Sequence, residues 1–155
     1  MNATPFHDGW TFRRQGSEST QTVTLPHDAM IHERREPDGA GGSAHAFFPG
    51  GVYVYEKDFT APAEWADQTV SFEFEGVYRK SSVAINGMRA GGCAYGYVPF
   101  RVCADGMLNY GGKNTVTVTV DNSGLPNSRW YSGSGIYRPV NLIVGNKTHI
   151  EWQGV

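Results

Sequence analysis

The chain has 155 residues, of which 39% are hydrophobic and 18% are charged. These totals are those of one globular domain with a hydrophobic core and exclude a disordered chain. The formal net charge of −2 argues against a nucleic-acid-binding protein, which needs a basic surface. No apolar run approaches the roughly 18 residues that a membrane-spanning helix needs.

The N-terminal stretch MNATPFHDGW lacks the basic region and apolar run of a secretory leader. We therefore expect a cytoplasmic protein if Met1 is the native start, whereas the compartment stays open if a leader has been removed. The two cysteines, Cys93 and Cys103, are too few for a disulfide framework and are predicted to be free thiols.

Alternation of apolar and polar residues predicts β-strands along most of the chain. In 114–122, for example, valines alternate with threonines, so that one face is apolar and the other is polar. The pair Asn86-Gly87 supplies the positive φ angles of a type I′ turn and predicts a hairpin. In chain order, the predicted strands and this hairpin occupy 51–59, 69–77, 82–90, 114–122, 138–144 and 148–152.

The segments between these strands show no convincing helical period. Single helical turns are expected near 61–66 and within 104–112, and 34–50 reads as one long loop, a feature that is often functional. Many short strands joined by turns predict an all-β fold. We expect an antiparallel β-sandwich of jelly-roll type that forms a single domain over 1–155.

A pair of glutamates is the first candidate for catalysis. Glu73 and Glu75 are alternate residues of one strand, about 6.6 Å apart, which is near the carboxylate separation of an inverting glycosidase. They also lie on the polar face of an amphipathic strand, where glutamates are ordinary solvent cover, and nothing nearby would raise their pKa. We therefore predict no catalytic role for either.

Two further candidates are weaker. Ser134 stands between glycines in YSGSGI, but the frame and the missing helix do not fit a nucleophile elbow. His27, His32 and His45 do not have the spacing of a zinc site. The sequence predicts no catalytic residue, no metal and no cofactor in this chain.

The stretch NSRWYSGSGIYRPV, residues 127–140, combines aromatic rings, arginines and glycines. Flat aromatic faces can stack on a sugar ring, while guanidinium and amide groups bind its hydroxyls. The alternative is that the rings belong to the core and the arginines form surface ion pairs. The composition alone leaves both interpretations open.

Several motifs together resemble the N-terminal sugar-binding domain of family 2 glycoside hydrolases, the β-galactosidase and β-glucuronidase group. They occur in order along nearly the whole chain, at the family's spacing. They are DGWTF (8–12), LPHDAMI (25–31), GGVYVYEKDF (50–59), FEGVYRKSSVAINGMRAGG (74–92), YGYVPFRV (95–102) and NSRWYSGSGIYRPVNL (127–142).

The resemblance implies a jelly-roll domain that normally precedes an immunoglobulin-like domain and a TIM barrel. Both catalytic glutamates of the family lie in that barrel, which needs about 250 residues and has no room in this sequence. The implied function is that of a non-catalytic domain of a retaining exo-acting glycosidase, with β-galactosidase favoured. The alternatives are a β-glucuronidase or β-mannosidase, a free-standing carbohydrate-binding module, and a structural or interaction domain.

In the family, a loop of this domain helps to shape the pocket for the terminal sugar. The implied partners are a β-galactoside-type carbohydrate and the remaining domains of a parent enzyme, with no nucleic acid and no membrane. Carried onto this chain, the expected substrate-binding residues are Asp121, Asn122, Arg129, Trp130 and Tyr131.

Overall fold

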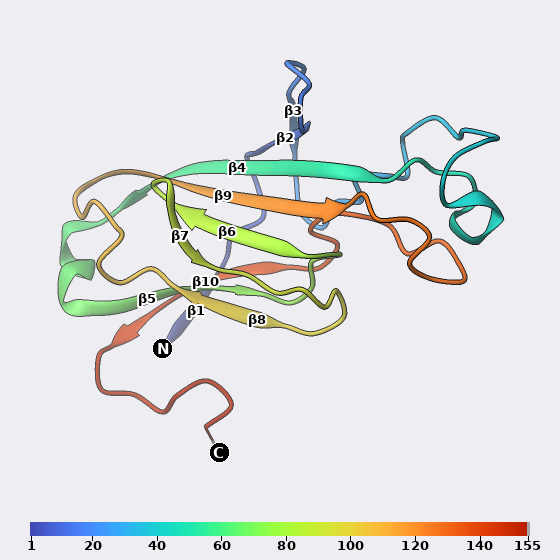
Figure 1. Cartoon of the computed structure of the whole chain (residues 1–155). Helices are drawn as coiled ribbons and strands as arrows, with labels where there is room; N and C mark the ends of the chain where they lie inside the picture. Colours follow the sequence, from blue (N-terminus) through green and yellow to red (C-terminus); the bar gives the residue numbers. More distant parts are fainter. Residues whose placement is uncertain (155) are drawn as a thin grey trace.

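The chain folds into two antiparallel β-sheets that face each other as a sandwich (Figure 1). The computed structural model describes residues 1–154. One sheet has the strand order β1-β10-β5-β8 and the other has the order β3-β2-β4-β9-β6-β7, which confirms the predicted all-β sandwich. The first sheet consists of β1 (Asn2–Pro5), β5 (Gln68–Phe74), β8 (Phe100–Cys103) and β10 (Val140–Asn146). The second consists of β2 (Trp10–Arg14), β3 (Gln21–Val23), β4 (Gly51–Ala61), β6 (Ser81–Ile85), β7 (Met88–Gly91) and β9 (Gly112–Asn122).

Most of the predicted elements are present. Asn86 and Gly87 have φ angles of 51° and 78° and form the predicted turn between β6 and β7. The turn expected near 61–66 is the 3-10 helix η2 (Ala63–Asp67), and the long loop contains the 3-10 helix η1 (Gly42–His45). No helix within residues 1–154 is long and apolar enough to cross a membrane.

Two details of the strand prediction were wrong. The expected last strand at 148–152 does not form, because β10 already pairs with β1 on one side and with β5 on the other. After Asn146 the chain leaves the sheet, and Trp152 lies 5.3 Å from the guanidinium of Arg101. The short strands β1 and β3 were not predicted, whereas β2 and β8 overlap the DGWTF and YGYVPFRV motifs.

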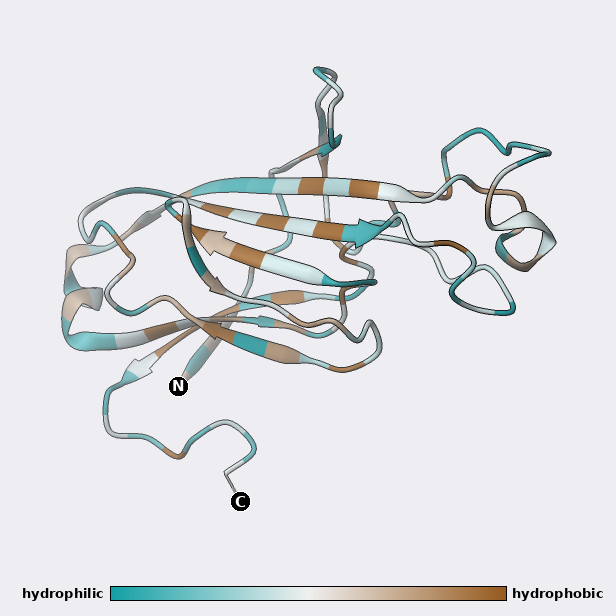
Figure 2. Ribbon diagram, viewed as in Figure 1, coloured by the Kyte–Doolittle hydropathy of each residue, from teal (hydrophilic) through white to brown (hydrophobic). Residues whose placement is uncertain are grey.

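The core lies between the two sheets and follows the alternation of the sequence. Val116, Val118 and Val120 of β9 are fully buried, as are Tyr53 and Tyr55 of β4. Figure 2 shows the resulting alternation of hydrophobic and hydrophilic residues along β9. Because burial of each large apolar side chain contributes about 1.5–3 kcal/mol, these alternating positions determine which face of each strand points inward.

An asparagine terminates the apolar stripe of β9 at one end of the sandwich. Asn114 is 1% exposed. Its Oδ1 accepts hydrogen bonds from Asn86 Nδ2 at 2.8 Å and from the backbone N–H of Asn109 at 2.7 Å. Its Nδ2 donates to the carbonyl oxygens of Asn109 at 3.1 Å and Gly112 at 3.0 Å. All hydrogen-bonding positions of this amide are therefore used to join the β6–β7 turn to the 104–111 turn.

A second asparagine occupies the other end of the same stripe. Asn122 is fully buried, and its Nδ2 donates to the carbonyl oxygen of Gly133 at 3.1 Å and to Ser134 Oγ at 2.6 Å. Its Oδ1 accepts from Asn127 Nδ2 at 2.7 Å. Asn122 thus ties both limbs of the 123–139 loop to the end of β9.

The loops that matter for function gather at the Asn122 end. Gly51, the first residue of β4, pairs with Asn122, and Val140 of β10 pairs with the last residue of β5. The connections over 24–50, 75–80, 92–99 and 123–139 therefore reach the same end of the sandwich, where the first and last of them project on the right of Figure 1.

We predict that Asn114→Ala lowers the free energy of unfolding by about 1–3 kcal/mol, because partly buried backbone groups of Asn109 and Gly112 lose their partners. Urea denaturation of the two proteins measures this difference. Asn109→Ala is the matched control: it removes an exposed amide bonded only to the Lys113 carbonyl oxygen, and should change stability by less than about 0.5 kcal/mol. Equal losses in the two variants would contradict the prediction.

Asn122→Ala should loosen the 123–139 loop while the sandwich stays folded. The Gly133 carbonyl and the Ser134 hydroxyl would lose a buried donor, at a cost of about 2 kcal/mol. Hydrogen exchange followed by mass spectrometry should show faster exchange in peptides from 123–139 and little change in β5 and β9. Ser123→Ala, at an exposed neighbouring position, is the control. Unchanged exchange in the loop would show that Asn122 does not hold it.

Candidate functional site

The 123–139 loop is held at a second point by Asp28, which lies in the LPHDAMI motif. Asp28 Oδ1 accepts from the backbone N–H groups of Met30 at 3.0 Å and Ser134 at 3.1 Å. Its Oδ2 accepts from the hydroxyl of Tyr131 at 2.6 Å. Hydrogen bonds to a carboxylate are stronger than hydrogen bonds between two neutral groups. Asp28 therefore joins the 24–50 loop firmly to the 123–139 loop.

The backbone of the same region approaches the core closely at Gly135. This residue has a φ angle of 113°, and a Cβ atom here would collide with the hydroxyl of Tyr55. The Tyr55 hydroxyl lies 2.9 Å from His27 Nδ1, and burial lowers the pKa of the His27 imidazole. Only glycine can adopt this conformation so close to the Tyr55 hydroxyl.

His45 supports the loop from the opposite side. Its imidazole is fully buried, and its Nε2 accepts from the backbone N–H of Asn127 at 3.2 Å. Burial lowers the pKa of His45, which favours the neutral ring that this acceptor role requires. His45 therefore connects η1 to the start of the 127–140 stretch.

A groove of about 420 Å³ opens among three of the clustered loops, and we call it the aromatic groove. Cavities of this size can hold one or two sugar rings. Several of its aromatic rings are strongly exposed: Trp130 is 67% exposed, Tyr95 is 62% and Tyr97 is 51%. Its lining residues are Tyr78, Arg79, Ala94, Tyr95, Gly96, Tyr97, Asn127, Ser128, Arg129 and Trp130.

The tyrosines of this groove support one another. The ring of Tyr97 lies 5.2 Å from that of Tyr78 and 5.6 Å from that of Tyr95. The Tyr78 hydroxyl donates to Asn127 Oδ1 at 3.0 Å, which links the wall of the groove to the 123–139 loop. Gly96 allows this packing, because a Cβ at this position would overlap the Tyr78 ring.

The five residues predicted to bind substrate occupy three different environments. Arg129 and Trp130 line the aromatic groove. Asn122 lies beneath the loop, and Asp121 accepts from the backbone N–H and the hydroxyl of Ser123, at 3.0 Å and 2.6 Å. Tyr131 turns toward Asp28 and packs 5.1 Å from the ring of Phe48. The structure therefore brings Arg129 and Trp130 together, and uses Asn122 and Tyr131 as anchors.

Tyr78, Arg79, Tyr95 and Tyr97 were not among the predicted site residues. They come from the 75–80 and 92–99 loops, which are far from 127–140 in the sequence. The Tyr-Gly-Tyr spacing in YGYVPF was a signal for Tyr95 and Tyr97. No local pattern marked Tyr78 or Arg79. We add these four residues to the candidate site.

The other sequence candidates are engaged elsewhere. Arg101 Nε lies 2.7 Å from Glu73 Oε2, and Asn141 Nδ2 donates to Glu75 Oε1 at 3.3 Å. Ser134 is fully buried, so its hydroxyl is not presented to a substrate. Within residues 1–154, no three His, Cys, Asp or Glu side chains are grouped as metal ligands.

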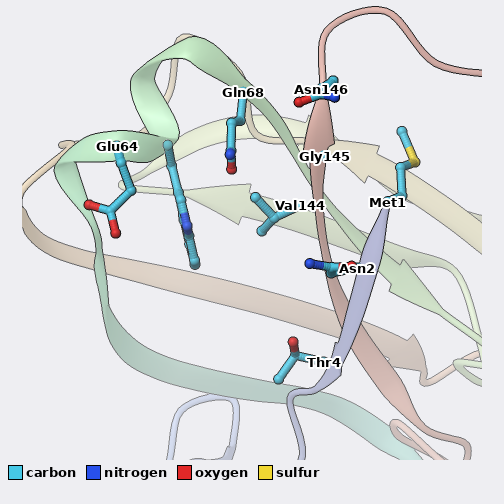
Figure 3. A pocket seen from close by; sticks show the side chains of 9 residues that line it. Met1, Asn2, Thr4, Glu64, Gln68, Val144, Gly145 and Asn146 are labelled. Atoms are coloured by element: carbon cyan, nitrogen blue, oxygen red, sulfur yellow. The ribbon is translucent and has the colours of Figure 1, made fainter.

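A second cleft, of about 480 Å³, lies at the far end of the sandwich between η2 and β1 (Figure 3). Its lining includes Trp65, together with Glu64, Gln68 and Asn2. This cleft is slightly larger than the aromatic groove but offers one aromatic ring and no arginine. We therefore regard the aromatic groove as the candidate functional site.

Comparison with known proteins supports a carbohydrate-active family, although no family model matches the chain. A β-galactosidase of Bacteroides ovatus is 41% identical over 133 residues, 84% of this chain. A β-glucuronidase of Formosa agariphila is 30% identical over 168 aligned residues, 94% of this chain. The chain spans only 15% and 17%, respectively, of the length of these relatives.

Solved structures agree with this relationship. A β-glycosidase from Bacteroides vulgatus superposes with a TM-score of 0.89 at 36% identity, over 97% of this chain and 21% of that one. A glycosyl hydrolase family 2 member from Bacteroides cellulosilyticus gives a TM-score of 0.84 at 28% identity, over 94% of this chain and 21% of that one. The chain is therefore a jelly-roll β-sandwich domain of the glycoside hydrolase family 2 type.

Proposed function

We propose that this chain is a non-catalytic domain of a retaining, exo-acting glycoside hydrolase, and that its aromatic groove forms part of the pocket for the terminal sugar. The observation that carries this proposal is the exposed Trp130 ring beside Arg129 in a groove of sugar size. An aromatic face binds the C–H side of a pyranose, and a guanidinium donates to its hydroxyls.

The chemistry of hydrolysis has to come from another part of the enzyme. Retaining hydrolysis needs two carboxyl groups, one as acid and one as nucleophile, on opposite sides of the glycosidic bond. The lining of the aromatic groove contains no carboxylate, and Glu73 is engaged by Arg101 on the four-stranded sheet. The groove can thus hold a sugar, while a catalytic domain supplies the carboxylates.

A β-galactoside is the substrate that we favour for the whole enzyme. The relative with 41% identity carries that activity in its name, and the RWYSGSGIYR stretch resembles that branch of the family. A β-glucuronidase is the main alternative, because relatives with that name match nearly the whole chain. A β-mannosidase of the same family is a further alternative.

A free-standing carbohydrate-binding module is the second candidate function. The 67% exposure of Trp130 favours it, because a ring this open can bind sugar without a partner domain. An immunoblot of extract from the source organism, with an antibody against this chain, distinguishes the two. We expect a band several times larger than 17.0 kDa. A band at 17 kDa would reject the parent-enzyme proposal and leave the binding module.

Trp130→Ala in the parent enzyme should lower kcat/KM for an aryl β-galactoside by about 5- to 30-fold, because stacking on the sugar contributes about 1–2 kcal/mol. Trp65→Ala, in the cleft at the far end, is the matched control and should change kcat/KM by less than about twofold. Steady-state kinetics of both variants, at a temperature where the melting curves show that each is folded, measure this. No effect of Trp130→Ala would place the groove outside the substrate pocket.

A further inference from the structure

The inward face of the four-stranded sheet becomes polar at the end of the sandwich opposite the aromatic groove. Val70 and Leu142 lie on this face and are buried in the core. Residues two apart on a strand share a face, and so do residues paired across two strands. By this rule four polar residues belong to the same inward face: Asn2, Thr4, Gln68 and Asn146. Three of them are exposed and Gln68 is half-buried, so the second sheet does not cover them.

These four residues line the cleft of about 480 Å³ between η2 and β1, which we call the far-end cleft. Figure 3 shows the side chains of Asn2 and Gln68 turned toward this hollow from opposite sides. Trp65 and Glu64 of η2 complete the lining together with Val144 and its neighbours. Trp65 is half-buried and packs against the core, which holds its ring in place. The far-end cleft thus combines an anchored aromatic ring with a set of polar side chains.

The polar side chains of the far-end cleft are free to bind a ligand. Within residues 1–154, none of them forms a hydrogen bond or an ion pair with another group of the chain. The amides of the cleft differ in this from the buried Asn114 and Asn122, whose groups are bonded within the chain. Each amide of the cleft therefore keeps a donor and an acceptor for a molecule from outside.

This combination of groups fits a neutral sugar. Neighbouring hydroxyls of a pyranose each donate and accept, as an amide does, while an indole ring packs against the C–H face of the sugar. The lining contains the carboxylate of Glu64 and no lysine, arginine or histidine, so an anionic ligand would find no cation. We infer that the far-end cleft is a second carbohydrate-binding site, which takes a neutral pyranose unit of a glycan.

The same lining does not suit a protein interface. The core of a stable interface is apolar, and every polar group buried in it needs a partner. A protein that covered the far-end cleft would have to pair three amides, the Thr4 hydroxyl and the Glu64 carboxylate one by one. A sugar brings one hydroxyl for nearly every carbon of its ring and meets this requirement with a small ligand.

The far-end cleft and the aromatic groove are too far apart to share one sugar ring. Ala61, at the end of β4 that leads into η2, pairs with Gly112, whereas Asn122 lies beneath the 123–139 loop. The 11 residues of β9 between these two ends span about 33 Å. A small aryl glycoside in the groove therefore does not contact Trp65. The inference adds a site to the proposed function and does not depend on it.

The test is a titration of the ¹⁵N-labelled 155-residue chain with two matched pairs of sugars, followed by ¹H–¹⁵N NMR. The pairs are methyl β-D-glucoside with methyl β-D-glucuronide, and methyl β-D-galactoside with methyl β-D-galacturonide. We expect at least one neutral sugar to shift the Trp65 indole N–H and the Gln68 side-chain amide, with a Kd of about 10 mM or tighter. In that pair the charged sugar should bind the cleft about fivefold more weakly, because no cation faces its carboxylate.

Single substitutions test which groups hold the sugar. Trp65→Ala and Gln68→Ala should each weaken binding at the far-end cleft by about fivefold or more, because each removes a direct contact. Gln21→Ala removes an exposed amide of β3 outside the cleft and should leave this affinity unchanged. Trp130→Ala should abolish sugar-induced shifts in the aromatic groove and leave those in the cleft unaltered. The dispersion of the ¹H–¹⁵N spectrum shows that each variant is folded, and Gln68→Ala decides if Trp65→Ala is not.

The outcomes separate this inference from the proposed function. Absence of shifts at the far-end cleft with about 50 mM of every sugar overturns the inference, and so does binding that survives Gln68→Ala and Trp65→Ala. Equal or tighter binding of the charged member of a pair overturns the neutral preference and with it the inference. The proposed function is judged instead by the size of the native protein and by the kinetics of Trp130→Ala, which do not involve the cleft.

Discussion

The inward face of β9 is the feature on which the rest of the structure depends. It reads Asn114, Val116, Val118, Val120 and Asn122, with every one of these side chains buried. The valines hold the two sheets together, while a buried amide at either end is tolerated because its hydrogen bonds are satisfied. One strand thus sets the length of the apolar core and the points at which loops attach to it.

A few hydrogen bonds fix the loops of the aromatic groove to the end of β9. Asn122 holds Gly133 and Ser134, and Asp28 holds Ser134 and Tyr131 from the facing loop. With both limbs of the 123–139 loop fixed, Trp130 can stay 67% exposed without the loop collapsing over it. The buried polar side chains of this region therefore hold the loop in a form that exposes an aromatic ring to water.

The sequence predicted what alternation and local motifs encode, and missed what only three-dimensional pairing decides. Strands β5 and β9 bury one face and so show period two, whereas β1 is exposed at every residue and gives no such signal. Arg129 and Trp130 were found because they share one conspicuous stretch, but Tyr97 joins them from another loop. The roles of Asn122 and Tyr131 follow from partners at 134 and 28, which no local pattern identifies.

Short, directional contacts, more than the field of the whole chain, limit what the aromatic groove is able to bind. The formal net charge of the chain is −2. At physiological ionic strength the screening length is about 8 Å, so a group placed in the groove would respond mainly to Arg79 and Arg129 and hardly to the far surface. Such contacts require the loops to be fixed beforehand, which is what the buried asparagine at the end of β9 achieves.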